Sequence, residues 1–218
     1  MSWFVTATGT DIGKTYVTAG LVRRARLAGK TVAALKPIAS GFDMTRAEES
    51  DAGQLLEALG EPVTPESIAR ICPWRFSEPL SPDMAAAREN RAIDFAALIA
   101  FCRAAIEANA TLFIEGVGGV MVPLDAKHTV LDWMAALGLP VVLVTGSYLG
   151  TLSHTLTAID VCGRRGLKLA AVVVNESGQG APPLTETVAT LERFNPGTRV
   201  ISLARNAGDF STVGEAII

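Results

Sequence analysis

A glycine, a lysine and a threonine in succession near the N-terminus have the types and the order that phosphate binding requires. Gly13, Lys14 and Thr15 follow the apolar residues 3–5 and open a helix-prone segment. In a turn between a strand and a helix, backbone N–H groups and the positive end of the helix dipole face an anion. The lysine then reaches the terminal phosphates, and the threonine hydroxyl can ligate Mg²⁺. We therefore predict that residues 7–15 form the phosphate-binding loop of a nucleotide site.

The spacing of this loop departs from the regular motif G-x-x-x-x-G-K-[ST]. Counting back from Gly13, the first glycine of the motif should stand at the position of Thr8. A nucleotide site at this loop therefore needs an altered spacing. The alternative is an ordinary turn between a strand and a helix, with no ligand.

Further polar residues stand where apolar strands end. Lys36 and Glu115 end two strand-like runs, Asn175 follows a third, and Asp51 comes shortly after Lys36. Ligands of an open parallel sheet bind beyond the carboxyl ends of its strands. We therefore expect these side chains to face a common ligand.

The charged residues also have structural interpretations. Lys36 could extend along the surface to solvent, and Asp51 could be only the N-cap of the helix that follows it. Glu115 would be costly at the end of an apolar strand unless it is paired or bound to a metal, and a carboxylate suits Mg²⁺. His128 and His154 are isolated, and we interpret both as packing or hydrogen-bonding residues.

Strand-like and helix-like stretches alternate along the chain. The strands are continuous apolar runs, which is typical of strands buried on both faces. The pattern predicts a doubly wound α/β fold of the P-loop NTPase type, with one mainly parallel sheet and helices on both faces. The predicted strands cover residues 4–6, 31–36, 111–115, 140–145, 169–174 and 199–203.

The bulk properties favour one domain over residues 1–218. Hydrophobic residues make up 49% of the chain, and no strongly charged or Ser/Pro-rich linker divides it. We expect the Pro-rich residues 60–91 to form an excursion over the sheet. A net charge of -3, evenly spread, argues against a nucleic-acid partner. The scattered cysteines and the lack of a long apolar run predict a cytoplasmic protein with reduced thiols and no membrane partner.

Several separated motifs, in the same order, resemble the dethiobiotin synthetases, the ATP-dependent enzymes that close the ureido ring in biotin synthesis. Residues 4–15 look like that family's extended phosphate loop, which is one residue longer than the usual spacing. The other similar segments are residues 36–41 (a second lysine motif), 50–52 (a metal aspartate), 78–82, 115–119 (an acidic glycine loop) and 149–154 (a later helix start). The resemblance runs through most of the chain.

This resemblance implies an ATP- and Mg²⁺-dependent cyclo-ligase. The enzyme would carboxylate 7,8-diaminopelargonate with CO₂, phosphorylate the carbamate with ATP and close the ring, giving dethiobiotin, ADP and phosphate. Its partners would be these small molecules and a second copy of the chain. In the homodimer, the helix start of one chain would hold the carboxylate of a substrate bound at the other chain's phosphate loop.

The resemblance also implies a role for individual residues. The catalytic residues would be Lys14, Lys36, Thr10 and Ser40. The metal ligands would be Thr15, Asp51 and Glu115. The contacts to ATP would be Asp11, Ile12, Gly13, Lys14, Thr15, Tyr16, Glu115, Gly118 and Asn175. The contacts to the substrate would be Thr10, Asp11, Lys36, Ser40, Gly150, Thr151, Leu152 and Ser153.

The sequence departs from the family's pattern in four places. Ala7 stands for the first loop glycine, Gly9 for an aspartate, and Asp11 for a longer glutamate. Residues 199–205 lack the Gly-x-Ile-Pro pattern expected near the nucleotide base. The base preference therefore stays open.

Two other function classes are compatible with a P-loop fold. A cobyrinate-type amide ligase usually carries a glutaminase domain with a catalytic Cys and His, and this chain has no suitable pair. A partition or septum-positioning ATPase is a nucleotide-dependent dimer switch with a signature lysine at the position of Gly9. No lysine precedes Lys14 here. Phosphate release that requires the substrate would distinguish the enzyme from the switch.

Overall fold

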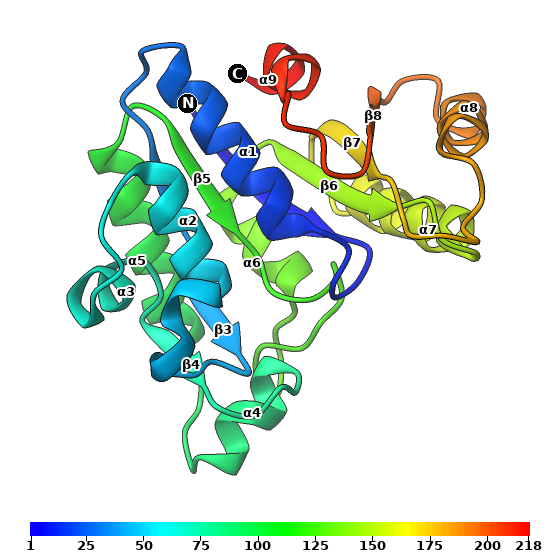
Figure 1. Ribbon diagram of the computed structural model, residues 1–218. Helices are drawn as coiled ribbons and strands as arrows, with labels where there is room; N and C mark the ends of the chain where they lie inside the picture. The colour runs from blue at the N-terminus through cyan, green and yellow to red at the C-terminus, as the bar shows by residue number, and fades with distance from the viewer.

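A six-stranded parallel sheet forms the centre of the molecule (Figure 1). The structure is a computed structural model that describes residues 1–218. The strands are β1 (Ser2–Ala7), β2 (Ala33–Leu35), β5 (Leu112–Glu115), β6 (Val141–Gly146), β7 (Leu169–Asn175) and β8 (Val200–Leu203). They lie in the order β2-β5-β1-β6-β7-β8, and each neighbouring pair is parallel. All six predicted strands are confirmed.

Helices cover both faces of the sheet, as the doubly wound fold requires. They are α1 (Lys14–Leu27), α2 (Asp51–Leu59), α3 (Pro65–Ile71), α4 (Pro82–Arg88), α5 (Phe95–Ala108), α6 (Val130–Leu137), α7 (Thr151–Arg164), α8 (Leu184–Phe194) and α9 (Ser211–Ile217), with a short 3-10 helix η1 (Met44–Glu49) before α2. Figure 1 shows α1 in front of the sheet, in contact with α2 and α9, and α5, α6 and α7 behind it.

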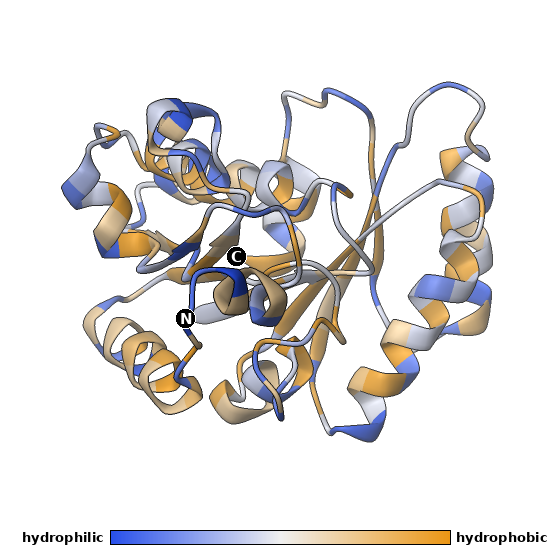
Figure 2. Cartoon of the chain, turned by 90° about the horizontal axis from the view of Figure 1, so that it is seen from below, coloured by the Kyte–Doolittle hydropathy of each residue, from blue (hydrophilic) through white to orange (hydrophobic).

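The central strands are apolar along their length because both of their faces are covered. Residues 141–144 of β6 and residues 171–174 of β7 are fully buried. Figure 2 shows these strands in orange through the middle of the molecule. They belong to one continuous cluster of 50 buried apolar residues. A core packed in this way fixes where the strand ends lie.

A second, two-stranded parallel sheet pairs β3 (Ile38–Ser40) with β4 (Trp74–Phe76). Residues 60–91 were predicted to pass over the main sheet, but β4 and α4 of this segment lie beyond its edge instead. Figure 1 shows β3, β4 and α4 past the end of β5, below the larger sheet. The reason is that β4 pairs with β3, which continues directly from the end of β2. Ile68 and Phe76 from this segment join the same apolar core.

The strand order changes direction at β1. This strand is hydrogen-bonded to β5 on one side and to β6 on the other, whereas the chain runs from β1 to β2 at the outer edge of the sheet. A crevice forms beyond the carboxyl ends of parallel strands at such a point, and ligands bind there. The strands β1, β2, β5, β6 and β7 all end at this edge, so the segments that follow them begin there.

Candidate functional site

The predicted phosphate loop connects β1 to α1 and turns at Gly13. This glycine has a φ of 93°, and a Cβ atom there would lie 2.2 Å from Nδ2 of Asn175. The same Asn175 nitrogen donates to the carbonyl oxygen of Ile12 over 3.1 Å. Asp11 has a φ of 56°, which residues other than glycine rarely adopt. The end of β7 therefore holds the loop in a strained turn of the kind that directs backbone N–H groups at an anion.

Lys14 opens α1 and folds back over the loop. Its Nζ donates to the carbonyl oxygen of Gly9 over 3.2 Å, and its side chain is largely buried. Burial, together with the nearby charge of Lys36, lowers the pKa of Lys14 to about 8. The ammonium group thus lies inside the loop, where a phosphate would meet it.

Four predicted residues from distant parts of the sequence meet in one charged cluster beside the loop. The Thr15 hydroxyl lies 2.8 Å from Asp51 Oδ1 and 2.8 Å from Glu115 Oε1. Lys36 Nζ lies 2.7 Å from Asp51 Oδ2 and 2.7 Å from Glu115 Oε1. It also donates to the carbonyl oxygen of Gly116 over 3.0 Å. Lys36, Asp51 and Glu115, three of the side chains expected to face a common ligand, therefore lie together at the ends of the strands.

The ends of secondary-structure elements place each member of this cluster. Lys36 follows β2, and Glu115 is the last residue of β5. Asp51 is the first residue of α2. The N-cap of this helix is Ser50, whose hydroxyl accepts a hydrogen bond from the backbone N–H of Gly53. The interpretation of Asp51 as the helix cap is therefore wrong. Lys36 is 1% exposed, so the interpretation of an extended lysine in solvent is wrong as well.

Charge pairing outweighs burial within the cluster. Burial disfavours the ammonium form of Lys36, but Glu115 and Asp51 overcome this effect and raise the pKa of Lys36. Burial also disfavours the Asp51 carboxylate, but the charge of Lys36 prevails and lowers the pKa of Asp51. Both groups are therefore charged at neutral pH.

One oxygen of the cluster remains without a partner. Glu115 Oε2 is buried and accepts no hydrogen bond, an arrangement that is costly unless a donor or cation reaches it. The molecule has no group of three or more His, Cys, Asp or Glu residues that could hold a metal ion by themselves. Two carboxylates and the Thr15 hydroxyl instead form a set of hard oxygens that suits Mg²⁺ bound together with phosphates.

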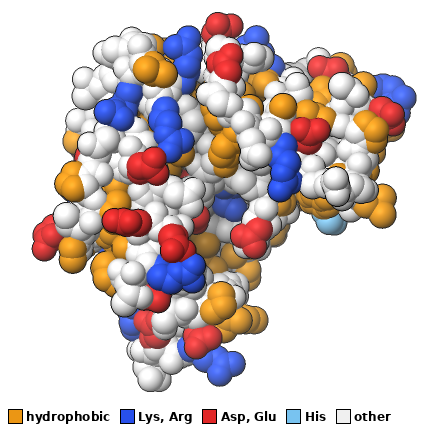
Figure 3. Space-filling view, in the orientation of Figure 1, with side chains coloured by type: hydrophobic (Ala, Val, Ile, Leu, Met, Phe, Trp, Pro, Cys, Tyr) orange, Lys and Arg blue, Asp and Glu red, His pale blue; other side chains and the backbone are white.

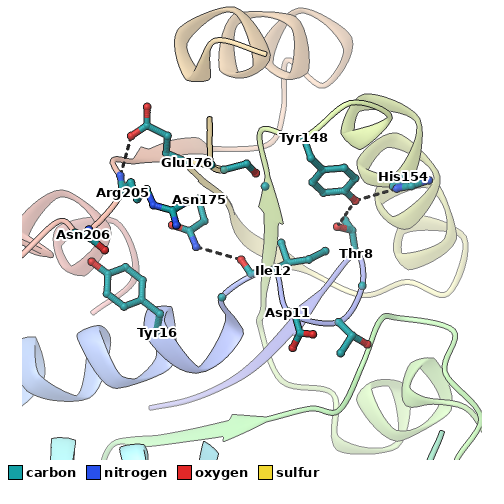
Figure 4. A pocket seen from close by; sticks show the side chains of 16 residues that line it. Thr8, Asp11, Ile12, Tyr16, Tyr148, His154, Asn175, Glu176, Arg205 and Asn206 are labelled. Atoms are coloured by element: carbon teal, nitrogen blue, oxygen red, sulfur yellow. Dashed lines mark hydrogen bonds between the residues drawn. The ribbon is translucent and has the colours of Figure 1, made fainter. Parts of the chain in front are cut away.

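An open cleft of about 700 Å³ runs along the phosphate loop (Figure 4). Figure 4 shows Tyr148 and His154 on one side of the loop and Tyr16, Arg205 and Asn206 on the other. Predicted residues in its lining are Thr10, Asp11, Ile12, Gly13, Tyr16 and Asn175. On the space-filling surface, a basic side chain is recessed in a central hollow with acidic side chains around it (Figure 3). The cleft is thus large and polar enough for a nucleotide.

Sequence reasoning missed several residues of the cleft. They are Tyr148, Glu176, Arg205 and Asn206, and His154, interpreted as a packing or hydrogen-bonding residue, also lines the cleft. These four residues share one signal, because each stands within three residues of the end of β6, β7 or β8, at the same edge of the sheet as the residues that were found.

Comparison with known proteins decides the family. A family model described as an AAA domain matches residues 2–207. The ATP-dependent dethiobiotin synthetase BioD of Acidiphilium cryptum is 52% identical over 193 residues, which cover 88% of this chain and 86% of that protein. The protein of the same name from Methylobacterium nodulans is 51% identical over 211 residues, covering 94% of this chain and 93% of its own. The chain belongs to the dethiobiotin synthetase family.

Solved structures outside the dethiobiotin synthetases share the fold. The MinC:MinD cell division protein complex of Aquifex aeolicus aligns with a TM-score of 0.56 at 10% identity, covering 99% of this chain and 86% of that chain. A ParA family ATPase from Chlorobium tepidum aligns with a TM-score of 0.55 at 11% identity, covering 99% and 88%. This likeness confirms the P-loop NTPase fold and carries no function. The high sequence identity to dethiobiotin synthetases disfavours the function of a partition or septum-positioning switch.

The fold accommodates two departures from the dethiobiotin synthetase pattern. Ala7 is the last residue of β1, is fully buried and does not have a positive φ, so its methyl group causes no backbone strain. Gly9 also lacks a positive φ, but a Cβ atom there would lie 3.1 Å from Cδ1 of Ile12. A side chain at this position is therefore limited by the packing of Ile12 within the loop.

Two further predicted residues lie in neighbouring loops and strands. Ser40 ends β3, and its buried hydroxyl has no hydrogen-bond partner. Gly118 has a φ of 59° in the loop after β5, where the next residue, Gly119, comes close to the Thr8 carbonyl. The unpartnered hydroxyl of Ser40 is free to donate to a ligand, whereas Gly118 shapes the loop that packs on the phosphate loop.

The predicted helix start lies at the N-terminal end of α7. Gly150 precedes the helix with a φ of 97°. Thr151 is turned inward, because its hydroxyl donates to the Gly146 carbonyl over 2.6 Å and its N–H donates to the Tyr148 carbonyl over 3.1 Å. The Gly150, Leu152 and Ser153 amides have no acceptor in the protein. Of the four predicted residues, all except Thr151 therefore offer free N–H groups.

The histidines and cysteines make structural contacts. The His128 ring stacks on Phe95 with their centroids 4.0 Å apart, and His154 Nδ1 lies 2.9 Å from the Tyr148 hydroxyl. The three cysteines are free and buried, and none is hydrogen-bonded to a histidine, so the Cys-His pair of a glutaminase is absent. No helix combines the length and the hydropathy that crossing a bilayer requires.

Proposed function

We propose that the chain is an ATP-dependent dethiobiotin synthetase that acts on 7,8-diaminopelargonate and CO₂. One amine and CO₂ form a carbamate, ATP phosphorylates the carbamate, and the second amine displaces phosphate to close the ureido ring. The observation that carries this proposal is the 52% identity over 88% of the chain to a dethiobiotin synthetase. The residues of the loop, the charged cluster and the cleft form one site around this chemistry.

The reaction brings two anions together, so cations are its main requirement. A carbamate and a γ-phosphate repel each other, and positioned positive charge lowers the barrier to phosphoryl transfer. Lys14 lies within the phosphate loop, and Lys36 is held as an ammonium ion beside it. We assign Lys14 to the phosphates and Lys36 to the carbamate and the transferring group. No nucleophilic side chain is needed, because positioning dominates this chemistry.

The residues of the charged cluster fit Mg²⁺. Thr15, Asp51 and Glu115 would hold it, and the buried Glu115 Oε2 without a partner supports this assignment. When bound, Mg²⁺ would neutralise charge on the β- and γ-phosphates. The same two carboxylates bind Lys36 Nζ, so Lys36 and Mg²⁺ compete for their oxygens.

Other residues of the cleft would orient ATP and the diamine. Thr10 and the unpartnered Ser40 hydroxyl can donate to the carbamate or the phosphate. Asp11 can accept from the ammonium side of the diamine. The lining of the cleft supports contacts of the nucleotide with the backbone of Ile12 and Gly13 and with Tyr16 and Asn175. Glu115 and Gly118 complete the ATP contacts from the loop after β5.

We further propose a single functional domain over residues 1–218 that works as a homodimer with shared sites. In each site, the N-terminal end of α7 from one chain binds the carboxylate of a substrate held at the other chain's phosphate loop. The free amides of Leu152 and Ser153 and the positive end of the helix dipole support this assignment. Leu149, beside them, is 90% exposed.

Subunit exchange tests the shared site. Lys14→Ala removes the loop function and Ser153→Asp places a negative charge at the helix start, where it should repel the carboxylate. After random exchange, half of the dimers contain one chain of each kind, and each such dimer regains one intact site. Activity should therefore return to about a quarter of normal under two-fold symmetry. Exchange without recovery would show that each chain binds its substrate alone.

The function itself is tested by the substrate dependence of ATP turnover. We expect ADP release from the purified protein with Mg²⁺ to require both diaminopelargonate and bicarbonate, because phosphoryl transfer needs the carbamate as acceptor. Equal ADP release without the diamine would contradict the proposal and favour a switch ATPase.

A further inference from the structure

A buried group of hydroxyls connects the phosphate loop to α7. Thr145, near the end of β6, lies at its centre. Its Oγ1 is 2.9 Å from that of Thr151, 2.8 Å from that of Thr155 and 3.1 Å from that of Thr8. Thr145 and its two partners on α7 are at most 2% exposed. The end of one central strand, the start of a helix and the loop after β1 thus meet at a single hydroxyl.

The donors and acceptors of this hydroxyl cluster form one consistent arrangement. The Thr151 hydroxyl donates its proton to the Gly146 carbonyl over 2.6 Å. It can therefore only accept from its neighbours, because a threonine hydroxyl has one proton. In one arrangement that satisfies every group, Thr145 donates to Thr151 and accepts from Thr155 and Thr8. Removing the central hydroxyl leaves Thr8 and Thr155 only the longer contacts with Tyr148 (3.4 Å) and Thr151 (3.5 Å).

The hydroxyl cluster reaches the cleft through Thr8. The Thr8 hydroxyl lies 3.4 Å from the Tyr148 hydroxyl, which lies 2.9 Å from His154 Nδ1, and Figure 4 shows these three side chains in a row along the loop. A buried threonine does not acquire partners automatically, because the hydroxyl of Thr6 in β1 is buried with none. The contacts of Thr145 are therefore specific to the place where the end of β6, the start of α7 and the loop after β1 meet.

We propose that Thr145 is a positioning residue that fixes the phosphate loop relative to the N-terminal end of α7. It lines no part of the cleft and acts only through Thr8 on one side and Thr151 and Thr155 on the other. The inference rests on the proposed function, in which the loop binds the phosphates and the start of α7 binds the substrate carboxylate. A loop that shifts against α7 would misalign both ligands.

Two substitutions separate the hydroxyl from the shape of the side chain. Thr145→Val keeps the branched shape and removes the hydroxyl, whereas Thr145→Ser keeps the hydroxyl and removes the methyl group. We expect Thr145→Val to bind ADP about fivefold more weakly by calorimetry, the scale of one hydrogen bond, and to raise the KM for ATP and for diaminopelargonate. Thr145→Ser should bind ADP as the wild type does. Thr187→Val is the control, because it removes a buried hydroxyl from α8, and it should also bind ADP as the wild type does.

The outcomes distinguish this inference from the proposed function. If the wild type fails to bind ADP, the proposed nucleotide site is wrong. If the wild type binds ADP and Thr145→Val binds it equally well, with unchanged KM values, Thr145 serves packing alone and the inference is overturned. An equal loss in Thr145→Ser would also overturn it. Should Thr145→Val fail to fold, Thr155→Val tests the α7 contact and Thr8→Val the loop contact by the same ADP measurement.

Discussion

Lys36 Nζ and Glu115 Oε1 lie 2.7 Å apart, with their side chains 2% and 0% exposed. The two residues follow and end neighbouring parallel strands, β2 and β5, so the sheet itself brings them together. A buried pair of this kind is costly to form, and breaking it by removing one partner costs still more because the other charge stays buried. The same contact thus links the stability of the fold to the chemistry of the site.

The first prediction concerns the loss of this pair. We expect Lys36→Met to abolish turnover and to lower the free energy of unfolding by about 3 kcal/mol, because Glu115 keeps a buried charge. Adding Glu115→Gln should restore much of the stability without restoring turnover. Urea unfolding followed by circular dichroism measures the four free energies of the double-mutant cycle. Additive losses in the double variant would show that the two side chains do not stabilise each other.

The second prediction concerns Mg²⁺. We expect Asp51→Asn to weaken the Mg²⁺ dependence of ADP binding, because a neutral amide oxygen is a poor ligand for a hard cation. The measurement is an ADP titration at increasing Mg²⁺ concentration. Asp160→Asn is the matched control, since Asp160 is 58% exposed and pairs only with Arg164 on its own helix. The same Mg²⁺ dependence in Asp51→Asn and the control would remove Asp51 from the metal ligands.

The third prediction concerns pH. The pKa of Lys14 is lowered from its ordinary value of 10.5 to about 8, so the free protein loses this charge as pH rises through about 8. We expect ADP binding to weaken above this pH and to be accompanied by proton uptake, which calorimetry in two buffers of different ionisation enthalpy detects. Between about pH 8 and pH 10.5, Lys14 is protonated in the unfolded chain but not in the folded chain. The contribution of Lys14 to the free energy of unfolding therefore rises with pH in this range. Weaker ADP binding at high pH therefore does not result from a loss of stability caused by Lys14. ADP binding without proton uptake would show that another group carries the charge that binds the phosphates.

The fourth prediction concerns the turn of the phosphate loop. We expect Gly13→Ala to abolish ADP binding, because the new Cβ would lie 2.2 Å from Asn175 Nδ2 at a φ of 93°. Gly138→Ala is the matched control, with a φ of 65° and no atom within 4 Å of the added Cβ. The control should lose about 1 kcal/mol of stability from backbone strain and no ADP affinity. Equal ADP affinity in both variants would contradict the role of the loop geometry.

Most of the fold could be predicted from the sequence, because buried parallel strands are long apolar runs. The six strands of the main sheet follow from this signal alone. The small sheet of β3 and β4 could not be predicted, since each strand has three residues and its partner lies far away in the sequence. Such short pairing depends on tertiary contacts rather than on local preference.

The charged cluster could be predicted in part. Glu115 and Lys36 stood out because a charge at the end of an apolar strand needs a partner. Their contact with each other depends on strand order, which the sequence does not state. Tyr148 and Arg205 were missed because a polar residue in a loop carries no such cost. Their place in the cleft follows only once β6 and β8 are known to end at the same edge.

The measurement that tests the central claim most directly is the fate of carbon from labelled bicarbonate. The purified protein is supplied with ATP, Mg²⁺, diaminopelargonate and ¹³C-bicarbonate, and the products are analysed by mass spectrometry, with Lys14→Ala as the control. A dethiobiotin synthetase should form dethiobiotin that carries the label in its ureido carbon, together with an equal amount of ADP, and the control should form neither. ADP without labelled dethiobiotin would contradict the assigned reaction.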